Sequence, residues 1–283
     1  MATELAPVLE LAPERAASHV SWPRLARIWA SVWPKLAAVA LALGAWQGIV
    51  WSGWQPDYAL PGPLPVFERL AQDLRNSDFD LGIAVTLRRA LLGYAIAVAI
   101  GSAAGLLIAR VTLLRKAVGS AILGLQSMPS IVWFPLAIIL FGLNETAIFF
   151  VVILGAAPAI AGGLLSGVDH VQPLLIRVGR VMGARGLRLY RHVILPASLP
   201  SFVGGLRQGW AFAWRSLMAG EIINVVGRQF SIGQQIQVAR DFADMEQLIA
   251  IMVVIFVIGV VIDQLFGACD RALRRRWGLG GES

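Results

Sequence analysis

Charged residues are scarce in this sequence: only 14% of its 283 residues are Asp, Glu, Lys or Arg, whereas 57% are hydrophobic. A soluble domain of this length needs a more polar surface, because average domains carry about 25% charged residues. The mean hydropathy of +0.70 points the same way, since insertion into a bilayer is the physical means of accommodating so much apolar surface. The sequence therefore predicts a membrane protein.

Cysteine and the common catalytic motifs are lacking as well. The single cysteine, Cys269, excludes an intrachain disulfide framework and a cysteine-rich metal site. The histidines, His19, His170 and His192, are far apart and have no metal partner at helical spacing. Neither of the two lysines lies in a glycine-rich turn, and no Gly-x-Ser-x-Gly elbow occurs. We expect no catalytic residue, bound metal or cofactor on this chain, and no enzymatic activity of its own.

Apolar stretches of membrane-spanning length recur along the chain. A bilayer core about 30 Å thick needs about 20 apolar residues of helix. Six stretches meet or approach this length: 36–55, 90–109, 117–144, 146–168, 199–225 and 247–268. Pro129 and Pro135 interrupt the third, so we expect that helix to be kinked or broken near residues 127–130. The predicted fold class is all-α, a polytopic membrane protein with about six transmembrane helices.

The arginines indicate how these helices are oriented. Basic residues cluster in three places: between the second and third stretches, between the fourth and fifth, and after the sixth. The positive-inside rule places all three clusters in the cytoplasm, which six spans with both termini cytoplasmic satisfy. A net charge of +7 therefore indicates topology and a lipid environment, and not nucleic acid as a partner. We expect a tail over 1–34, a membrane domain over 35–270 and a tail over 271–283.

The segment 66–89, before the second stretch, is amphipathic and not uniformly apolar. We expect an interfacial helix lying on the outer surface and leading into that span. Arg88 and Arg89 at its end would then lie near the headgroups, as simple snorkelling anchors.

The loop between the fourth and fifth stretches, about 170–198, is too long and too amphipathic for a connector. Val178, Val181 and Met182 share one helical face, and a second short helix is expected to begin after Gly186. Such a helix-turn-helix offers a rigid surface to a partner protein. The alternative is a solvated basic loop that only sets topology, although that role needs no apolar face.

This loop also resembles a known family. Gly183, then nine residues, then Val193-x-Leu195-Pro196 is similar to the cytoplasmic loop of binding-protein-dependent ABC importer permeases. The family often has Glu-Ala-Ala at the start of the motif, where this chain has Arg, Val and Gly at 177–179. The segments 133–137 and 213–217 are most similar to the branch that serves nitrate, taurine, aliphatic sulfonates and bicarbonate.

The resemblance implies a MetI-like type I importer fold in a multi-pass protein of the cell (inner) membrane. It implies a homodimer, two ATPase subunits that bind ATP and Mg, an external substrate-binding protein, and contact with membrane lipid. The loop would carry the helix that couples this subunit to the ATPase. The implied coupling residues are Arg177, Gly179, Gly183, Ala184, Arg185, Gly186, Leu187, Tyr190, Val193, Leu195 and Pro196.

Two groups of residues are candidates for a translocation path. Trp214, Arg215 and Glu221 lie in the fifth stretch, where charge at membrane depth usually faces protein or water. Arg215 can favour an anion that Glu221 fixes or gates, or the two charges can form structural ion pairs with neighbouring helices. Gln126, Ser127 and Ser130 lie at the expected helix break and can donate hydrogen bonds to sulfonate or nitrate oxygens. Alternatively, that break only shapes packing.

Taken together, these features predict the permease subunit of an ATP-driven importer for a small anion, in the first place an aliphatic sulfonate or taurine. Nitrate and bicarbonate stay open as alternative substrates. A self-sufficient secondary transporter is the rival of a different class, although such proteins often contain two related halves, and no internal repeat is visible.

Overall fold

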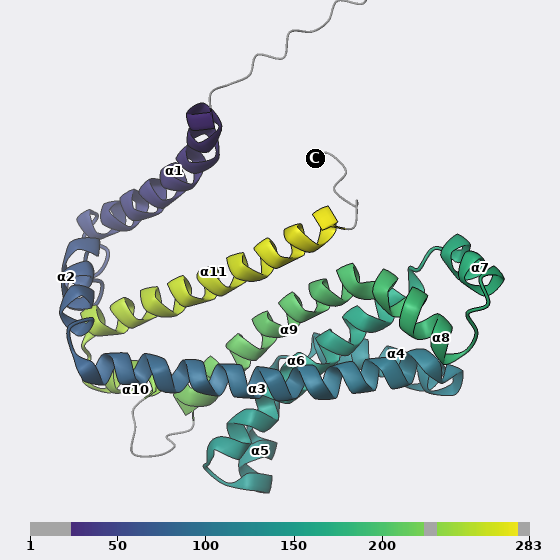
Figure 1. Ribbon diagram of the computed structural model, residues 1–283. Helices are drawn as coiled ribbons and strands as arrows, with labels where there is room; N and C mark the ends of the chain where they lie inside the picture. Colours follow the sequence, from purple (N-terminus) through teal and green to yellow (C-terminus); the bar gives the residue numbers. More distant parts are fainter. Residues whose placement is uncertain (1–23, 224–230, 277–283) are drawn as a thin grey trace, which may run out of the picture. The chain divides into compact units, whose positions relative to one another are not determined.

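The computed structural model describes residues 24–223 and 231–276, and every regular element within those ranges is helical. This confirms the all-α prediction. The chain divides into two compact units, residues 1–54 and residues 55–283. Figure 1 shows the helices in chain order.

The first unit contains helix α1, Arg24–Trp51. Its residues 32–51 are long and apolar enough to cross a membrane. The helix starts before residue 35, the predicted start of the membrane domain, and Pro34 lies inside it. The predicted tail up to residue 23 lies outside the described residues. After the helix, Gly53 has a φ of +68°, a left-handed conformation that glycine adopts without steric cost.

The second unit contains the remaining helices. They are α2 (Pro63–Asp73), α3 (Ser77–Arg110), α4 (Thr112–Ser127), the 3₁₀ turn η1 (Ser130–Trp133), α5 (Phe134–Phe141), α6 (Glu145–Asp169), α7 (Pro173–Val181), α8 (Leu187–Leu189), the π-helical segment η2 (Tyr190–Ile194), α9 (Leu195–Ile223), α10 (Ile232–Asp241) and α11 (Met245–Arg276). Side chains cap three of their N-termini: Asn76 begins α3, Asn144 begins α6, and Ser231 begins α10 through a capping box with Gln234.

The prediction of one interfacial helix over 66–89 is wrong, because this segment is divided between two helices. Helix α2 ends at Asp73, and α3 begins at Ser77 after a short turn. The chain breaks there because the Asn76 side chain accepts a hydrogen bond from the Asp78 backbone N–H and starts a new helix. Residues 77–89 are therefore the first turns of the long helix α3.

The break in the third stretch is confirmed. Helix α4 ends at Ser127, Met128 is extended with a ψ of 131°, and the chain resumes at η1 and α5. Pro129 explains the break, because a proline removes a backbone donor and disfavours helical geometry in the residue before it.

By length and apolar composition, four of the described helices can cross a membrane: α3, α6 and α11 of the second unit, and α1. Two of the six predicted spans do not meet this criterion. The third is divided between α4 and α5, and α9 falls short in apolar composition although it has 29 residues. Arginines, serines and a glutamine lower the hydropathy of α9, which suggests that one of its faces does not meet lipid.

Helix α6 lies at the centre of the second unit, beside α3 and α9 (Figure 1). A Cβ added at Gly163 of α6 would lie 2.4 Å from the Gly205 Cα of α9. The two backbones can approach this closely only because both residues are glycine, as is usual where membrane helices pack. Helices α3 and α6 run parallel, and α9 runs antiparallel to them. We call the end of the unit near Arg110 and Leu195, which carries the loop 170–198, the loop end. The opposite end, near Ser77 and Ile223, is the far end.

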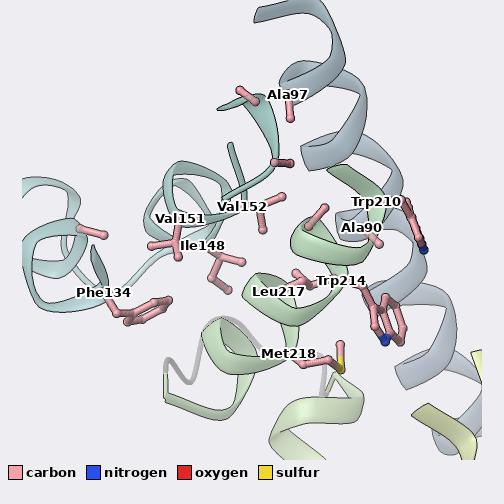
Figure 2. Close-up of a cluster of buried hydrophobic side chains, with 14 of the residues drawn as sticks. Ala90, Ala97, Phe134, Ile148, Val151, Val152, Trp210, Trp214, Leu217 and Met218 are labelled. Carbon is pink, nitrogen blue, oxygen red and sulfur yellow. The ribbon is translucent and has the colours of Figure 1, made fainter. Parts of the chain in front are cut away.

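Bulky side chains fill the space between these helices toward the far end (Figure 2). Phe134 of α5, Ile148 of α6 and Leu217 of α9 are fully buried. Aromatic contacts extend the cluster, since the Tyr94 and Trp210 rings meet edge to face with centroids 5.2 Å apart. This packing fixes α3, α6 and α9 as a common frame for the polar groups that they carry.

A polar contact joins α2 to the turn between α10 and α11. Arg69 is within 3.3 Å of the Asp73 carboxylate and within 3.3 Å of the Asp244 carboxylate. Asp73 is 8% exposed, and burial raises the pKa of its carboxyl above the ordinary value, against the opposing effect of Arg69.

Candidate functional site

The loop end carries a helix-turn-helix, as the sequence predicts. Helix α7 ends at Val181, Gly183 and Gly186 have φ angles of +86° and +52°, and α8 begins at Leu187. Both glycines adopt a left-handed conformation that a larger side chain would strain. The Ala184 N–H donates to the Gly179 carbonyl at 2.9 Å, which closes the turn.

A small apolar cluster holds this loop together. Gly179 packs so closely that an added Cβ would lie 2.9 Å from the Val193 side chain and 3.0 Å from the Leu189 side chain. Leu189 is buried together with Val171 and Ile194. The two short helices therefore form one folded unit, which can move as a body.

The loop is connected directly to two long helices. Segment η2 continues without interruption into α9 at Leu195. The Tyr190 hydroxyl donates to the Ala109 carbonyl at 3.4 Å, and the Arg110 guanidinium lies 5.5 Å from the centre of the Tyr190 ring. The loop is therefore attached to the loop ends of both α3 and α9.

The outer surface of the loop is apolar at its tip and basic around it. Val181 is 89% exposed and Met182 is 81% exposed. Exposed apolar side chains gathered at one place usually mark an interaction site. A cleft of about 460 Å³ lies beside the tip, lined by Arg180, Arg185 and Leu189 among others. Of the implied coupling residues, Arg177, Gly183, Arg185, Gly186 and Leu187 are exposed, Gly179 is buried, and Ala184, Tyr190, Val193, Leu195 and Pro196 are half-buried.

The candidate path residues at the helix break lie against α6 and α9. Ser130 accepts a hydrogen bond from the Ser216 hydroxyl of α9 at 2.7 Å. The Gln126 side-chain amide donates to the Pro158 carbonyl of α6 at 3.0 Å. Ser127 donates only to the Gly124 carbonyl of its own helix and is exposed. The first two thus have protein partners, and Ser127 is the one accessible to a solute.

The structure does not bring Arg215 and Glu221 together. Arg215 is exposed, donates to the Ala211 carbonyl of its own helix at 2.9 Å, and lies over the Phe212 ring at 4.9 Å. Trp214, beside it in sequence, is 8% exposed and stacks on Trp210. Glu221 is completely buried. Neighbouring positions on α9 thus meet very different surroundings.

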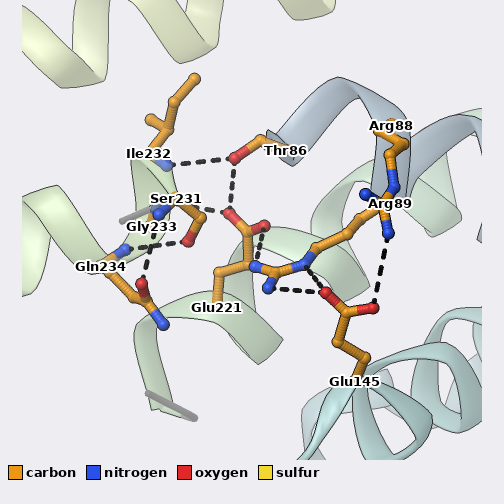
Figure 3. Close-up of polar contacts among 9 residues, drawn as sticks. All are labelled: Thr86, Arg88, Arg89, Glu145, Glu221, Ser231, Ile232, Gly233 and Gln234. Atoms are coloured by element: carbon orange, nitrogen blue, oxygen red, sulfur yellow. Dashed lines mark hydrogen bonds and ion pairs between the residues drawn. The ribbon is translucent and has the colours of Figure 1, made fainter. Parts of the chain in front are cut away.

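Glu221 belongs to a buried polar network at the far end (Figure 3). Its carboxylate accepts from the Arg89 guanidinium at 3.1 Å, from the Thr86 hydroxyl at 2.9 Å and from the Gly233 N–H at 3.3 Å. Thr86 in turn accepts from the Ile232 N–H at 3.0 Å. The network therefore joins α3 and α9 to the start of α10, and every contact satisfies a buried polar group.

Arg89 extends the same network to α6. Its guanidinium donates to Glu145 at 2.9 and 3.0 Å, and Arg88 lies 3.9 Å from the other oxygen of Glu145. The expectation that Arg88 and Arg89 are both snorkelling anchors is wrong for Arg89, which is 3% exposed. Two carboxylates and the close packing of three helices hold it inside the protein. Only Arg88, whose side chain is 66% exposed, fits the anchor interpretation.

Sequence reasoning missed Thr86 and Arg89 as partners of Glu221, and Glu145 as the second carboxylate on Arg89. A signal was available, because a carboxylate at membrane depth needs a cation or several donors. From Arg110, Arg89 is 21 residues away, about 31 Å along α3, close to the thickness of a bilayer core. That spacing places Arg89 at the same end as the C-terminal part of α9.

A second arginine–carboxylate pair joins α9 and α11. Arg207 donates to both oxygens of Asp263, each at 2.7 Å. Unlike the pair at Glu221, this one is open, with side chains that are 48% and 51% exposed. Asp263 also lines a groove of about 580 Å³ with Trp214, Met252, Phe256, Val260 and Gln264.

No cluster of His, Cys, Asp and Glu that could hold a metal ion occurs within residues 24–223 and 231–276. His170 and His192 each contact only a nearby backbone carbonyl or serine of the same segment.

Comparisons with known proteins place these features in context. Residues 74–275 match the family described as binding-protein-dependent transport system inner membrane component. A probable ABC transporter permease of Brucella melitensis is 30% identical over 238 residues, covering 84% of this chain and 94% of that protein. The taurine transport system permease of Escherichia coli K12 is 28% identical over 253 residues, covering 85% and 91%.

Solved structures agree on the fold. A chain in an inward-facing structure of the MetNI methionine ABC transporter superposes with a TM-score of 0.57 at 21% identity, covering 68% of this chain and 94% of that one. This confirms the MetI-like fold that the resemblance implied.

Proposed function

The chain belongs to the binding-protein-dependent transport system inner membrane components, the permease subunits of ABC importers, and from this premise we propose that it forms the translocation path for a small sulfonate anion. An aliphatic sulfonate or taurine is the proposed substrate. The taurine permease among its relatives supports this class. The single observation that carries the proposal is the environment of Arg215.

Arg215 is an exposed cation on α9, 20 residues and about 30 Å from its loop end. Among the described residues its contacts are the Ala211 carbonyl and the Phe212 ring, and no carboxylate pairs with it. A guanidinium facing lipid costs about 2.5–3.5 kcal/mol at the centre of a span and less toward its end, so such a group usually faces water or protein. An anion in an aqueous path supplies the missing counter-charge.

Other accessible residues of α9 support a path along the same face. Ser201, Gly204, Gln208 and Arg215 are exposed and recur at spacings of three, four and seven, which places them in one row. Leucine, isoleucine and phenylalanine would be expected on a lipid-facing row. The row also contains Phe212, between Gln208 and Arg215, but its exposed members are small or polar and it ends at an arginine, which suits the passage of a hydrated anion.

The loop of α7, α8 and η2 is proposed as the coupling element. Its exposed apolar tip at Val181 and Met182, surrounded by arginines, suits a groove on an ATPase subunit. Because η2 continues into α9 and Tyr190 contacts α3, ATP-driven movement of the ATPase would tilt both helices. The loop end would then be cytoplasmic, as would both termini, and the far end would receive substrate from the external binding protein.

We further propose a complex of two copies of this chain, two ATPase subunits and the binding protein, in the cell membrane. The ATPase subunits would bind ATP and Mg, and closure of their pair would switch the permeases between inward-open and outward-open states. Such a switch requires each state to make different contacts with ligand or partner.

Reconstitution of the purified complex tests the substrate. ATPase activity and uptake are measured in proteoliposomes with taurine, butanesulfonate, nitrate and bicarbonate, each with the binding protein present. We expect stimulation by the sulfonates. Stimulation by nitrate or bicarbonate alone would replace the sulfonate with a smaller anion, and uptake by the lone chain without ATPase would show a secondary transporter instead.

Cross-linking tests the coupling loop. A photoreactive residue at Met182 is expected to capture the ATPase subunit in the assembled complex. Phe242, 82% exposed on the C-terminal side of α10, is the matched control and should capture no ATPase. Capture from Phe242 but not from Met182 would reverse the proposed orientation.

A further inference from the structure

The open Arg207–Asp263 pair lies where a charge pair is costly. Arg207 is 12 residues into α9, about 18 Å from its loop end, and Asp263 lies within residues 245–273 of α11, a candidate membrane span. Half of each side chain is nevertheless exposed. Charged groups at this depth usually face a water-filled cavity or another protein chain.

The geometry of the pair shows what else Arg207 can bind. Two parallel contacts of 2.7 Å present the planar fork of the guanidinium to two oxygens. That fork matches carboxylates, phosphates and other oxyanions with a similar spacing of oxygens, and a sulfonate offers the same pair of acceptors. Because both side chains are half exposed, a competing oxyanion can reach Arg207 without unfolding the pair's surroundings.

The groove beside Asp263 supplies an apolar surface next to this cation. It is formed by Trp214 on α9 and by Met252, Phe256 and Val260 on α11, and its volume of about 580 Å³ is within the range of small-molecule sites. Arg207 and Trp214 are seven residues apart and so lie on one face of α9. The polar end of the groove is thus Asp263, to which Arg207 is bound, with the Gln264 amide beside it, and the rest is hydrocarbon and indole.

We propose that Arg207 is an anion-binding residue of the translocation path, at which the sulfonate group of the substrate displaces the Asp263 carboxylate while the aliphatic part lies in the groove. This inference rests on the proposed anion function and narrows it to organic anions with an apolar portion. Asp263 holds Arg207 in place between substrate molecules and promotes release of the anion by returning to the guanidinium.

Charge exchange separates this role from a purely structural pair. In the double variant Arg207→Asp/Asp263→Arg the ion pair is retained, but the guanidinium now extends from α11 toward α9, and a carboxylate occupies position 207. We expect assembly of the complex to persist and butanesulfonate uptake to fall by at least about tenfold, the scale of a lost charge-assisted contact. Uptake within twofold of wild type would overturn the inference.

The loop end offers a matched control. Arg115 of α4 and Asp169 of α6 form another partly exposed ion pair, away from the groove. The exchange Arg115→Asp/Asp169→Arg should leave butanesulfonate uptake within about twofold of wild type, as expected for an exposed pair of small energetic weight. An equal loss in both exchanges would show that any charge exchange damages transport, and would also overturn the assignment of Arg207.

A labelling measurement tests whether the anion occupies the groove, and it can be made even if the charge exchange prevents assembly of the complex. Gln264→Cys is introduced together with Cys269→Ser in the full complex, and the rate of modification by a sulfonate-bearing thiosulfonate reagent is measured. We expect butanesulfonate to slow modification at least about threefold, whereas methanesulfonate at the same concentration protects less because it fills less of the groove. The wild-type chain, with exposed Cys269 as its only thiol, should show no protection.

Two outcomes separate a failure of the proposed function from a failure of the Arg207 site. If the wild-type complex takes up no sulfonate but is stimulated by a ligand of another class, the proposed function fails. If the wild-type complex takes up butanesulfonate and position 264 is unprotected or inaccessible, only the site at Arg207 fails.

Discussion

Helix α9 carries two arginine–carboxylate pairs in opposite surroundings. Glu221 near its far end is completely buried, and its partner Arg89 is 3% exposed. Arg207, nearer the loop end, and its partner Asp263 have side chains that are about half exposed. The first pair also receives a hydroxyl and a backbone N–H, whereas among the described residues the hydrogen bonds of the second are the two between its own members. An arginine–carboxylate pair is therefore buried among helices near the far end of α9, whereas a similar pair nearer the loop end is accessible to solutes.

Helical periodicity alone does not distinguish the two pairs. Arg207, Trp214 and Glu221 are spaced by seven residues and lie on one face of α9. Along that face exposure falls from half at Arg207 to 8% at Trp214 and zero at Glu221. The cause is the number of neighbours: α3, α6 and α10 surround Glu221 (Figure 3), while the contact of Arg207 is with α11.

The largest effect is expected from Glu221→Ala, which leaves Arg89 buried with one partner fewer. Breaking a buried pair by removing one member costs about 3–5 kcal/mol, so we expect little folded protein in detergent, measured by size-exclusion chromatography of a fluorescent fusion. The double variant Arg89→Met/Glu221→Leu should recover folded protein in part, since no unpaired charge is left between those two positions. A folded, stable Glu221→Ala protein would contradict the structural role of this pair.

Arg215→Gln is expected to affect transport and not folding. Arg215 is exposed and contacts only its own helix among the described residues, so the melting temperature should change little. Loss of a charge-assisted contact to the anion should lower sulfonate uptake by about tenfold. Arg215→Lys is the control and should retain part of the uptake because the charge is kept. Unchanged uptake and anion selectivity in Arg215→Gln would remove Arg215 from the path.

The sequence predicted the helices and the loop well for a physical reason. Apolar length, proline and the glycine pair are local signals, so the break at Ser127 and the turn between Gly183 and Gly186 were predictable. The partners of Glu221 were not, because Thr86 and Arg89 are more than 130 residues away in sequence and meet Glu221 only through tertiary packing. The start of α3 was misread because amphipathic patterning does not show where a capped turn at Asn76 divides two helices.

Asp263→Asn is expected to have a small effect on stability, in contrast to Glu221→Ala. Exposed ion pairs contribute about 0–1 kcal/mol, which corresponds to no more than about 2–4 °C in the melting temperature of a chain of this size. Thermal unfolding followed by tryptophan fluorescence in detergent measures the change. A destabilisation as large as that of Glu221→Ala would show that the exposed pair supports packing too, and the contrast between the ends of α9 would disappear.

The smallest effect concerns Asp73, in the contact between α2, Arg69 and Asp244. Because burial raises the pKa of the Asp73 carboxyl, the folded protein binds this proton more readily than the unfolded chain. Stability should therefore decline as pH rises from the ordinary aspartate range through the raised value, and be regained on acidification through the same window. Asp73→Asn should flatten this dependence by up to about 1 kcal/mol, the energy expected for a partly screened pair.

The measurement is the difference in melting temperature between wild type and variant across that pH window. Asp241→Asn, which changes an exposed carboxylate on α10, is the control. A wild-type protein that gains stability relative to Asp73→Asn as pH rises would show that Arg69 outweighs burial, and that this third pair resembles the satisfied pair at Glu221.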